Sequence, residues 1–370
     1  MHNHPHHVVY NKHREMCGVS LVPILALTLF SAPAVADTPP QVQWIKLVGT
    51  DRTEFNYGTA VDPFANSFVT GMTEGALDGN PRFGEYDAFL SKFDATGIKL
   101  WSRQIGTTSR DESRGIAADS QGNSYITGYT RGRFETSTTY SDFDAFLSKY
   151  DPDGSLLWTK YVGSHEDDKS YGVTVDHQDN VYITGKTENS LSGQNAGGND
   201  AFIAKFNPEG TRIWTRQLGT YHNEGGLSVA ADSLGNVFMS GYTTGAIDGN
   251  TGGGSGPFSS PLDAFLTKYD SAGTKLWTRQ IGTIESDLSE SVAIDSLGNS
   301  YITGYTRGGI DGNSNTSGNS FGRADVFLTK FDPDGLKMWT KQIGSVKDDF
   351  AYAVGVDGSD RIYVTGESGD

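Results

Sequence analysis

The chain has 370 residues, with 29 Lys and Arg against 45 Asp and Glu, so its formal net charge is −16 at pH 7. This acidic balance excludes a protein that binds a nucleic-acid backbone, because such binding needs clustered positive charge. Glycine is abundant at 47 residues and aromatic residues make up 11% of the chain, which indicates many tight turns around a packed core rather than a disordered chain.

The first 36 residues predict a secretory signal peptide. Lys12 and Arg14 precede an apolar run near residues 19–30, and the small residues Ala34–Ala36 follow it. This order predicts export and cleavage after Ala36. The apolar run is too short to span a hydrocarbon core of about 30 Å, so we expect no stable membrane insertion after signal removal. We therefore predict a secreted, periplasmic or cell-surface protein.

The rest of the chain repeats one unit, which the tryptophans mark. Each tryptophan lies 27 residues before the glycine of a Thr-Gly or Ser-Gly pair, and all but the first lie 14 residues after the aspartate of "DAF" or "DVF". Only the segment between that glycine and that aspartate varies, with 16, 16, 15, 22 and 21 residues. A fixed internal period of this kind is the signature of a repeat architecture. The tryptophans are Trp44, Trp101, Trp158, Trp214, Trp277 and Trp339.

Each unit predicts four short strands in chain order. A small-residue strand such as "RGIAAD" is followed by a "DSxGN" turn and a second strand such as "SYITGYT"; after the variable loop come "DAFLSKFD", a "DxxG" turn and "KLWSRQIGT". Asp, Asn and Gly at these turns are typical of β-hairpins. Four antiparallel strands repeated every 57–63 residues predict an all-β fold, a β-propeller of four-stranded blades. We expect the small-residue strand to be innermost and the tryptophan strand to cover the seam between blades.

These boundaries predict a signal peptide at 1–36 and one β-propeller domain at 37–370. About six blades are present, but only five "DAF" strands. The last blade is therefore incomplete, or the N-terminal segment "QVQWIKLVG" closes it by pairing with the strands of residues 350–367; a truncated reading of a longer propeller is the other alternative. The repeats lie near 41–94, 95–151, 152–207, 208–270, 271–332 and 333–370.

The runs "DAFLSKFDATGIKLW", "GTTSRDESRGIAADSQGNSYITGYT" and "GYTTGAIDGNTGGG" resemble the bacterial seven-bladed β-propeller repeat (SBBP) family. The resemblance covers residues 41–370. It implies an exported or surface-associated propeller without a general activity, and it supplies no catalytic residues to transfer. The number of blades in this sequence departs from the family name.

In an up-and-down blade, the variable loop and the connection to the next blade lie at the same end of the sheet. Insertions in repeat proteins often map to a binding face, so we expect ligands there. Five residues after the glycine of each "(I/L/V)G(T/S)", that connection carries an acid. The acids either shape the turn into the inner strand, the interpretation we favour, or form a carboxylate ring able to hold a hard cation. They are Glu54, Asp111, Asp168, Glu224, Asp287 and Asp349.

The longer loops contain Asp-Gly-Asn, which suits a tight turn and also supplies oxygen ligands for calcium. Calcium is the only cofactor that the sequence suggests, and the turn interpretation is the simpler one because the motif lacks the closing Glu of an EF-hand. The candidate ligands are Asp78, Asn80, Asp248, Asn250, Asp311, Asn313 and Asn315.

Enzyme interpretations find less support. "FDATGIKLW" resembles the "D-x-x-T-G-x-x-x-W" run of quinoprotein dehydrogenases, but only one repeat carries the Thr, and we find no Ser/His/Asp constellation. We predict an exported, non-catalytic binding or scaffold module for a protein or glycan, which uses the variable-loop face. The alternative is a propeller enzyme, quinoprotein-like or a hydrolase, with its site at the axial channel mouth. An enzyme would need polar residues that differ between blades, whereas the acids recur in every blade.

Overall fold

The computed structural model describes residues 26–28, 44–135, 138–193, 195–250, 261–313 and 323–369. Nearly all of the predicted signal peptide, including its cleavage site, and the candidate ligand Asn315 lie outside these residues. Within them, no helix has the length and apolar character that crossing a membrane would require.

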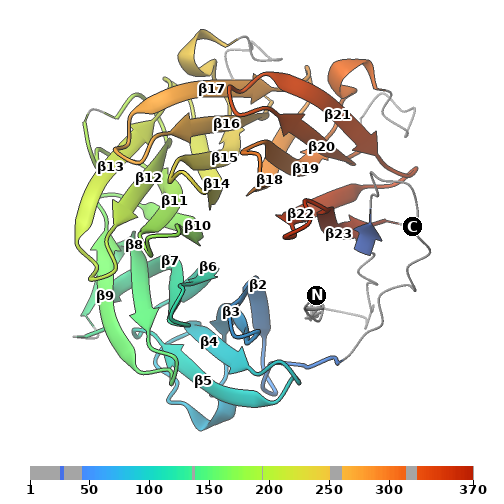
Figure 1. Cartoon of the computed structure of the whole chain (residues 1–370). Coiled ribbons are helices and arrows are strands. Elements are labelled where there is room, and N and C mark those ends of the chain that lie inside the picture. Colours follow the sequence, from blue (N-terminus) through green and yellow to red (C-terminus); the bar gives the residue numbers. More distant parts are fainter. Residues whose placement is uncertain are drawn as a thin grey trace. The chain divides into compact units, whose positions relative to one another are not determined.

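The described residues form antiparallel sheets whose four strands follow one another in chain order (Figure 1). This order is the one predicted for propeller blades. The first three sheets are β2 (Glu54–Val61), β3 (Ser67–Thr73), β4 (Asp87–Phe93) and β5 (Lys99–Ile105); β6 (Asp111–Ala118), β7 (Ser124–Arg133), β8 (Thr138–Tyr150) and β9 (Leu156–Val162); and β10 (Asp168–Val175), β11 (Val181–Thr187), β12 (Asp200–Phe206) and β13 (Arg212–Leu218).

The remaining part contains two more four-stranded sheets and a three-stranded sheet with the order β1-β23-β22. Short 3-10 helices η1 (Leu77–Gly79), η2 (Ile247–Gly249) and η3 (Ile310–Gly312) begin three of the variable loops. The strands are β14 (Glu224–Ala231), β15 (Val237–Thr243), β16 (Asp263–Tyr269) and β17 (Lys275–Ile281); β18 (Asp287–Ile294), β19 (Ser300–Thr306), β20 (Asp325–Phe331) and β21 (Lys337–Ile343); and β22 (Asp349–Val356), β23 (Ile362–Ser368) and β1 (Ala26–Thr28).

The first sheet shows why the repeat folds in this way. Its middle strands, β3 and β4, are buried along their whole length, whereas the edge strand β5 starts with two exposed residues. In the turn between β4 and β5, Oδ1 of Asp94 accepts hydrogen bonds from the backbone N–H groups of Thr96 and Ile98, both at 2.9 Å. Gly97 takes a φ of 80°, which favours glycine. The aspartate and the glycine of "DxxG" therefore make the turn.

The chain divides into two compact units. Among the described residues, unit 1 comprises those between 44 and 183 and between 206 and 212, and unit 2 comprises residues 26–28 and those between 184 and 205 and between 213 and 369. In unit 1 the core forms where the first sheet packs on the second, around the fully buried Phe68, Leu90, Ile126 and Phe146. In unit 2 the fourth and fifth sheets pack in the same way around Phe238, Leu266, Ile302 and Phe327.

The tryptophans cover the seams between sheets, as predicted. Nε1 of Trp101 donates a hydrogen bond of 3.0 Å to the carbonyl oxygen of Pro152, in the β8–β9 turn of the next sheet. A Cβ on Gly154 would lie 2.8 Å from the Trp101 ring, so only glycine lets the indole lie against this turn. The same contact joins Trp44 to Gly97, Trp158 to Gly210, Trp214 to Gly273 and Trp277 to Gly335.

The expected closure by the N-terminal tryptophan segment is wrong. Residues 44–50 form no strand; instead, Trp44 packs on the β4–β5 turn, where its Nε1 donates to the carbonyl oxygen of Ala95 at 3.3 Å. The residues that pair with β23 are Ala26–Thr28, in the predicted apolar run of the leader. In the other sheets the third strand pairs with the second, and β1 has that place in the last sheet.

Candidate functional site

One end of each sheet, here called the loop end, carries both the variable loop and the connection to the next sheet. In the first sheet, the backbone N–H of Glu74 donates to the carbonyl oxygen of Thr53 at 2.9 Å. In the fourth, the N–H of Thr244 donates to the carbonyl oxygen of Asn223 at 2.9 Å. The two segments therefore lie side by side, as expected for an up-and-down sheet.

A glutamine of the fourth strand fastens the start of the variable loop. Oε1 of Gln104 accepts a hydrogen bond from the backbone N–H of Leu77 at 3.0 Å, and Nε2 donates to Gly75 O at 3.0 Å and to Asp87 Oδ2 at 2.7 Å. The glutamine recurs in "RQIG", "RQLG" and "KQIG", a signal that sequence analysis did not use. Gln217, Gln280 and Gln342 make equivalent sets of bonds.

The six repeated acids each begin a first strand at the loop end and bind within their own turn. Oδ2 of Asp111 accepts from the backbone N–H of Thr107 at 2.6 Å and from its hydroxyl at 3.0 Å, while Oδ1 accepts from the Thr130 hydroxyl. Glu54, Asp168, Glu224, Asp287 and Asp349 likewise bind the Thr or Ser four residues earlier. These contacts support the interpretation that each acid shapes the turn into its strand.

The Asp-Gly-Asn loops do not fit a calcium site. The carboxylate of Asp248 binds Nζ of Lys275 at 2.6 and 2.7 Å, and Nδ2 of Asn250 donates to the carbonyl oxygen of Ile247 at 2.7 Å. Asp248 has a φ of 53°, so it also supplies the left-handed residue of a tight turn. Although burial opposes ionisation, the hydrogen bonds from Lys275 and Thr278 lower the pKa of Asp248.

The other two loops repeat these contacts. Asp78 pairs with Lys99, and Asp311 with Lys337. Nδ2 of Asn80 and of Asn313 donates to the carbonyl oxygens of Leu77 and Ile310, both at 2.7 Å. In all three loops, a lysine ammonium therefore lies where calcium would have to bind the carboxylate.

We expect calcium to leave the stability of the protein unchanged. An ion bound at a hundred times its Kd would add about 2.7 kcal/mol to the free energy of unfolding. Thermal melts with millimolar calcium and with a chelator should therefore give the same Tm. A calcium-dependent rise in Tm that Asp248→Asn removes would contradict this assignment, and Asp94→Asn, in a turn without the motif, is the matched control.

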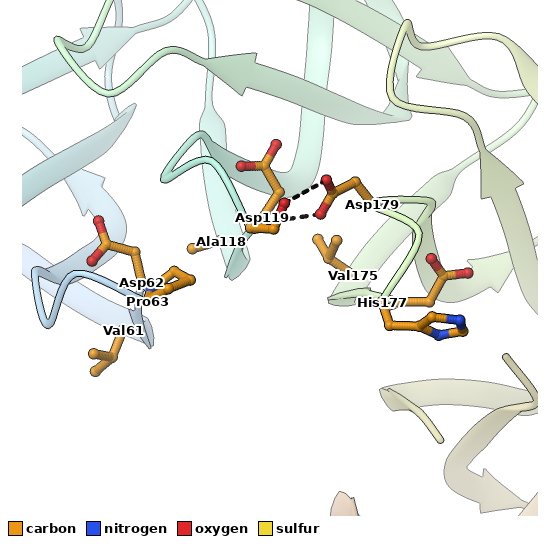
Figure 2. Close-up of a pocket in the computed structure, with 10 residues that line it drawn as sticks. Val61, Asp62, Pro63, Ala118, Asp119, Val175, His177 and Asp179 are labelled. Atoms are coloured by element: carbon orange, nitrogen blue, oxygen red, sulfur yellow. Dashed lines mark hydrogen bonds between the residues drawn. The ribbon is translucent and has the colours of Figure 1, made fainter. Parts of the chain in front are cut away.

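The opposite end of the sheets, here called the turn end, carries an open pocket of about 410 Å³ in unit 1 (Figure 2). It lies among the turns that join β2 to β3, β6 to β7 and β10 to β11. Ser120 binds Asp179 across two of these turns, through its N–H at 3.0 Å and its hydroxyl at 2.7 Å. Sequence analysis expected ligands at the other end and did not predict this pocket.

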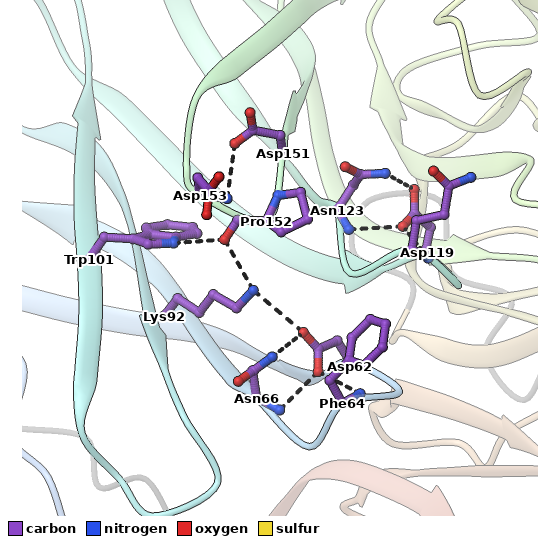
Figure 3. Close-up of polar contacts among 11 residues, drawn as sticks. Asp62, Phe64, Asn66, Lys92, Trp101, Asp119, Asn123, Asp151, Pro152 and Asp153 are labelled. Carbon is purple, nitrogen blue, oxygen red and sulfur yellow. Dashed lines mark hydrogen bonds and ion pairs between the residues drawn. The ribbon is translucent and has the colours of Figure 1, made fainter.

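Three acids of this pocket, Asp62, Asp119 and Asp176, are held by hydrogen bonds within their own turns. Asp62 accepts from the N–H groups of Phe64 and Asn66, at 2.9 and 2.8 Å, and its Oδ2 lies 3.6 Å from Nζ of Lys92 (Figure 3). The lysine in turn donates to the carbonyl oxygen of Pro152 at 3.2 Å. The turn at Asp62–Asn66 is therefore part of the contact between the first two sheets, and its acid has a structural role without a ligand.

The first strands carry a set of side chains that sequence analysis missed. Their pairing with the second strands shifts register at one residue, a β-bulge, and the residue type there varies: Tyr57, Arg114, Leu227, Glu290 and Tyr352. Bulges re-aim side chains and are frequent next to functional sites. Three residues after each recurring acid there is therefore a side chain whose chemistry varies between sheets, which is a property that an enzyme or a selective binding site needs.

In unit 1 the bulge of β6 lies among aromatic rings, and we call Tyr57, Arg114, Tyr129 and Tyr171 the Arg114 cluster. First strands β2, β6 and β10 are neighbours, and a Cβ on Gly115 would lie 2.9 Å from the carbonyl oxygen of Tyr171. The guanidinium carbon of Arg114 lies 4.0, 5.9 and 5.8 Å from the ring centroids of Tyr57, Tyr129 and Tyr171. Cation–π contacts of this kind fix the orientation of the guanidinium.

Two curated proteins are similar to this chain. An uncharacterized WD repeat-containing protein, L264, of Acanthamoeba polyphaga mimivirus is 23% identical over 92% of this chain and 32% of its own length. The regulatory protein FlaEY of Caulobacter vibrioides is 30% identical over 50% of this chain and 20% of its own length. The chain thus spans about a third and a fifth of these relatives.

A crystal structure of a protein of unknown function from Bacteroides caccae is 10% identical, covers 79% of this chain and 83% of its own, and has a TM-score of 0.44. The model of the SBBP beta-propeller repeat matches residues 100–135, 157–191, 213–247, 276–311 and 339–370. Each matched segment begins close to a tryptophan and contains the first two strands of the following sheet. With five such repeats and sheets of the propeller-blade type, the chain is a beta-propeller repeat protein that contains SBBP repeats.

Proposed function

We propose that this chain is an exported, non-catalytic binding module whose loop end holds a protein or glycan ligand. The proposal rests on the hydrogen bonds that attach the variable loops to their sheets. The glutamine bonds fasten the start of four of the five variable loops to their sheets, and the differences in loop length lie beyond that point. Variable loops on a rigid scaffold are a common way to build a binding surface.

Exposed apolar side chains at the loop end of unit 2 favour a protein ligand. Tyr221, Ile284 and Val346 are 85%, 79% and 69% exposed. They occupy the same position in three successive connections, two residues after the glycine of "(I/L)G(T/S)". The equivalent residues of unit 1, Thr108 and His165, are polar. Apolar groups gathered on one side of a surface mark interaction sites.

The N-terminal segment supports export, because its basic, apolar and small residues follow the order of a secretory signal. Fractionation of cells that express the full chain, with N-terminal sequencing of the product, would test this part. A product that begins after Ala36 and lies outside the cytoplasm is the expected result.

Loop exchange tests the binding surface. Protein and glycan arrays would be screened with the full chain, and any ligand found would be titrated against variants in which residues 244–262 or 307–324 are replaced by residues 74–86. Binding should fall at least tenfold, since a few central contacts dominate most interfaces. Replacing the turn 270–274 by 94–98, at the turn end, is the matched control. Binding that survives both loop exchanges would reject the loop end of unit 2 as the site.

A further inference from the structure

At the bulge of β6, the guanidinium of Arg114 has N–H donors that can bind a further acceptor. Its side chain is 29% exposed, and within the described residues its one carboxylate partner is Glu112, with Oε2 3.7 Å from Nε. The two terminal nitrogens therefore keep their donors for another acceptor. A guanidinium is planar and binds a carboxylate through two parallel hydrogen bonds.

Tyrosine rings frame this donor pair. Tyr129 is buried, at 8% exposure, and supports the guanidinium from within the sheet. Tyr57 is 36% exposed and stacks on Phe55 with ring centroids 6.1 Å apart, so its ring is held in place while part of the residue remains accessible beside the cation. An accessible aromatic face next to a charge suits a ligand that has both an apolar face and an acidic group.

The surroundings of Arg114 are cationic although the chain as a whole is acidic. Nε of Arg110 lies 2.5 Å from Oε1 of Glu112, and Nζ of Lys169 lies 2.7 Å from Oδ2 of Asp167. Arg131 packs over the ring of Phe143 at 4.3 Å. Three cations, Arg110, Arg114 and Lys169, thus share two carboxylates, Glu112 and Asp167, in a chain of net charge −16. Such a local excess of positive charge attracts an anion.

We propose that the Arg114 cluster binds a sugar acid, with the sugar carboxylate on the terminal nitrogens of Arg114 and an apolar sugar face on the ring of Tyr57. A single carboxylate fits because Arg110 and Lys169 already have acidic partners. The site is built from strands of unit 1, whereas the loop exchanges concern residues of unit 2, so this proposal and the loop-end proposal can fail separately.

Calorimetric titration of the full chain with a galacturonic acid trimer and with a galactose trimer tests the proposal. The acidic trimer should bind and the neutral one should not. Hydrogen bonds to charged groups contribute about 1.5–3 kcal/mol, so Arg114→Ala should weaken binding by roughly 10- to 100-fold. Tyr57→Leu, which keeps an apolar side chain without the flat ring, should weaken it several-fold. Leu227→Ala, at the equivalent bulge of unit 2, should have no effect.

Arg114→Ala leaves Glu112 with a single arginine partner and could therefore lower the stability of the fold. Arg114→Lys is the second variant, because it keeps the positive charge but loses the planar guanidinium. It should bind the acidic trimer more weakly than the wild type, with an unchanged Tm. Equal binding of both trimers, binding of neither, or wild-type affinity in both Arg114 variants would overturn the proposal. An Asp- and Glu-rich peptide that displaces the acidic trimer and binds with the same affinity would also overturn the proposal. The cluster would then recognise negative charge in general rather than a sugar acid.

Discussion

Replacing Gly304 by alanine is expected to destabilise the protein by about 3 kcal/mol, at the upper end of the usual cost of overpacking a core. A Cβ at this position would lie 1.9 Å from the carbonyl oxygen of Leu288. Gly304 pairs with Ser289, next to the bulge residue Glu290 in β18. Its own strand, β19, is almost entirely buried between neighbours, so neither backbone can move aside without breaking the sheet.

Urea unfolding of the wild-type chain and of Gly304→Ala measures this loss as a lower midpoint. The control is Gly355→Ala in β22, where a Cβ would meet nothing within 4 Å. This substitution should be neutral or stabilise by roughly 0.5–1 kcal/mol, because alanine loses less backbone entropy than glycine in a strand. Equal midpoints for Gly304→Ala and the wild type would show that the bulge tolerates a side chain.

The same contact explains why a glycine lies 27 residues after every tryptophan. Gly71, Gly128, Gly241 and Gly366 each face a first-strand carbonyl oxygen at 1.8 or 1.9 Å from the place of a Cβ. At Gly128 that oxygen belongs to Glu112, two residues before Arg114. The glycine therefore permits the bulge, and the bulge sets the direction of the residue that differs between sheets.

Comparison of the repeats was sufficient to predict the strands, their order and the turns, because each of these features needs the same residues in every sheet. The same comparison was misleading for the Trp44 segment, whose sequence matches that of the fourth strand in the other repeats. In the structure, residues 44–50 form no strand, and the strand that joins β23 in the last sheet is β1. Trp44 keeps the other role of its motif, the contact with the turn around Gly97.

Neither candidate site could be predicted fully from motifs. Asp248 and Asn250 have calcium-loop spacing, but Lys275, which neutralises the aspartate, comes from the next hairpin and is brought there only by the fold. Arg114 was missed for the opposite reason. A search for recurring residues passes over positions where the repeats differ, and the bulges are such positions.

Stability should rise as the pH falls from 7.5 to 5. Asp111 and Asp287 are fully buried, and burial raises the pKa of each to about 6, although hydrogen bonds from Thr107 and Thr130, and from Thr283 and Thr306, act in the opposite direction. A raised folded-state pKa means that the folded chain binds protons more tightly than the unfolded chain, whose aspartates titrate near 3.8. The resulting stabilisation is fully present below pH 3.8 and is lost as the pH rises through 6.

Each of the two groups should contribute roughly 1 kcal/mol between pH 7.5 and pH 5, since one pKa unit corresponds to about that free energy. Urea unfolding at half-unit pH steps measures the slope. The double variant Asp111→Asn/Asp287→Asn, whose amides resemble the protonated acids, should flatten it. Asp94→Asn is the control, because hydrogen bonds from Thr96 and Ile98 lower the pKa of Asp94 and confine its effect to more acidic solutions. A wild-type stability that does not change between pH 5 and 7.5, or a slope that persists in the double variant, would show that these carboxyl groups are ionised in the folded chain.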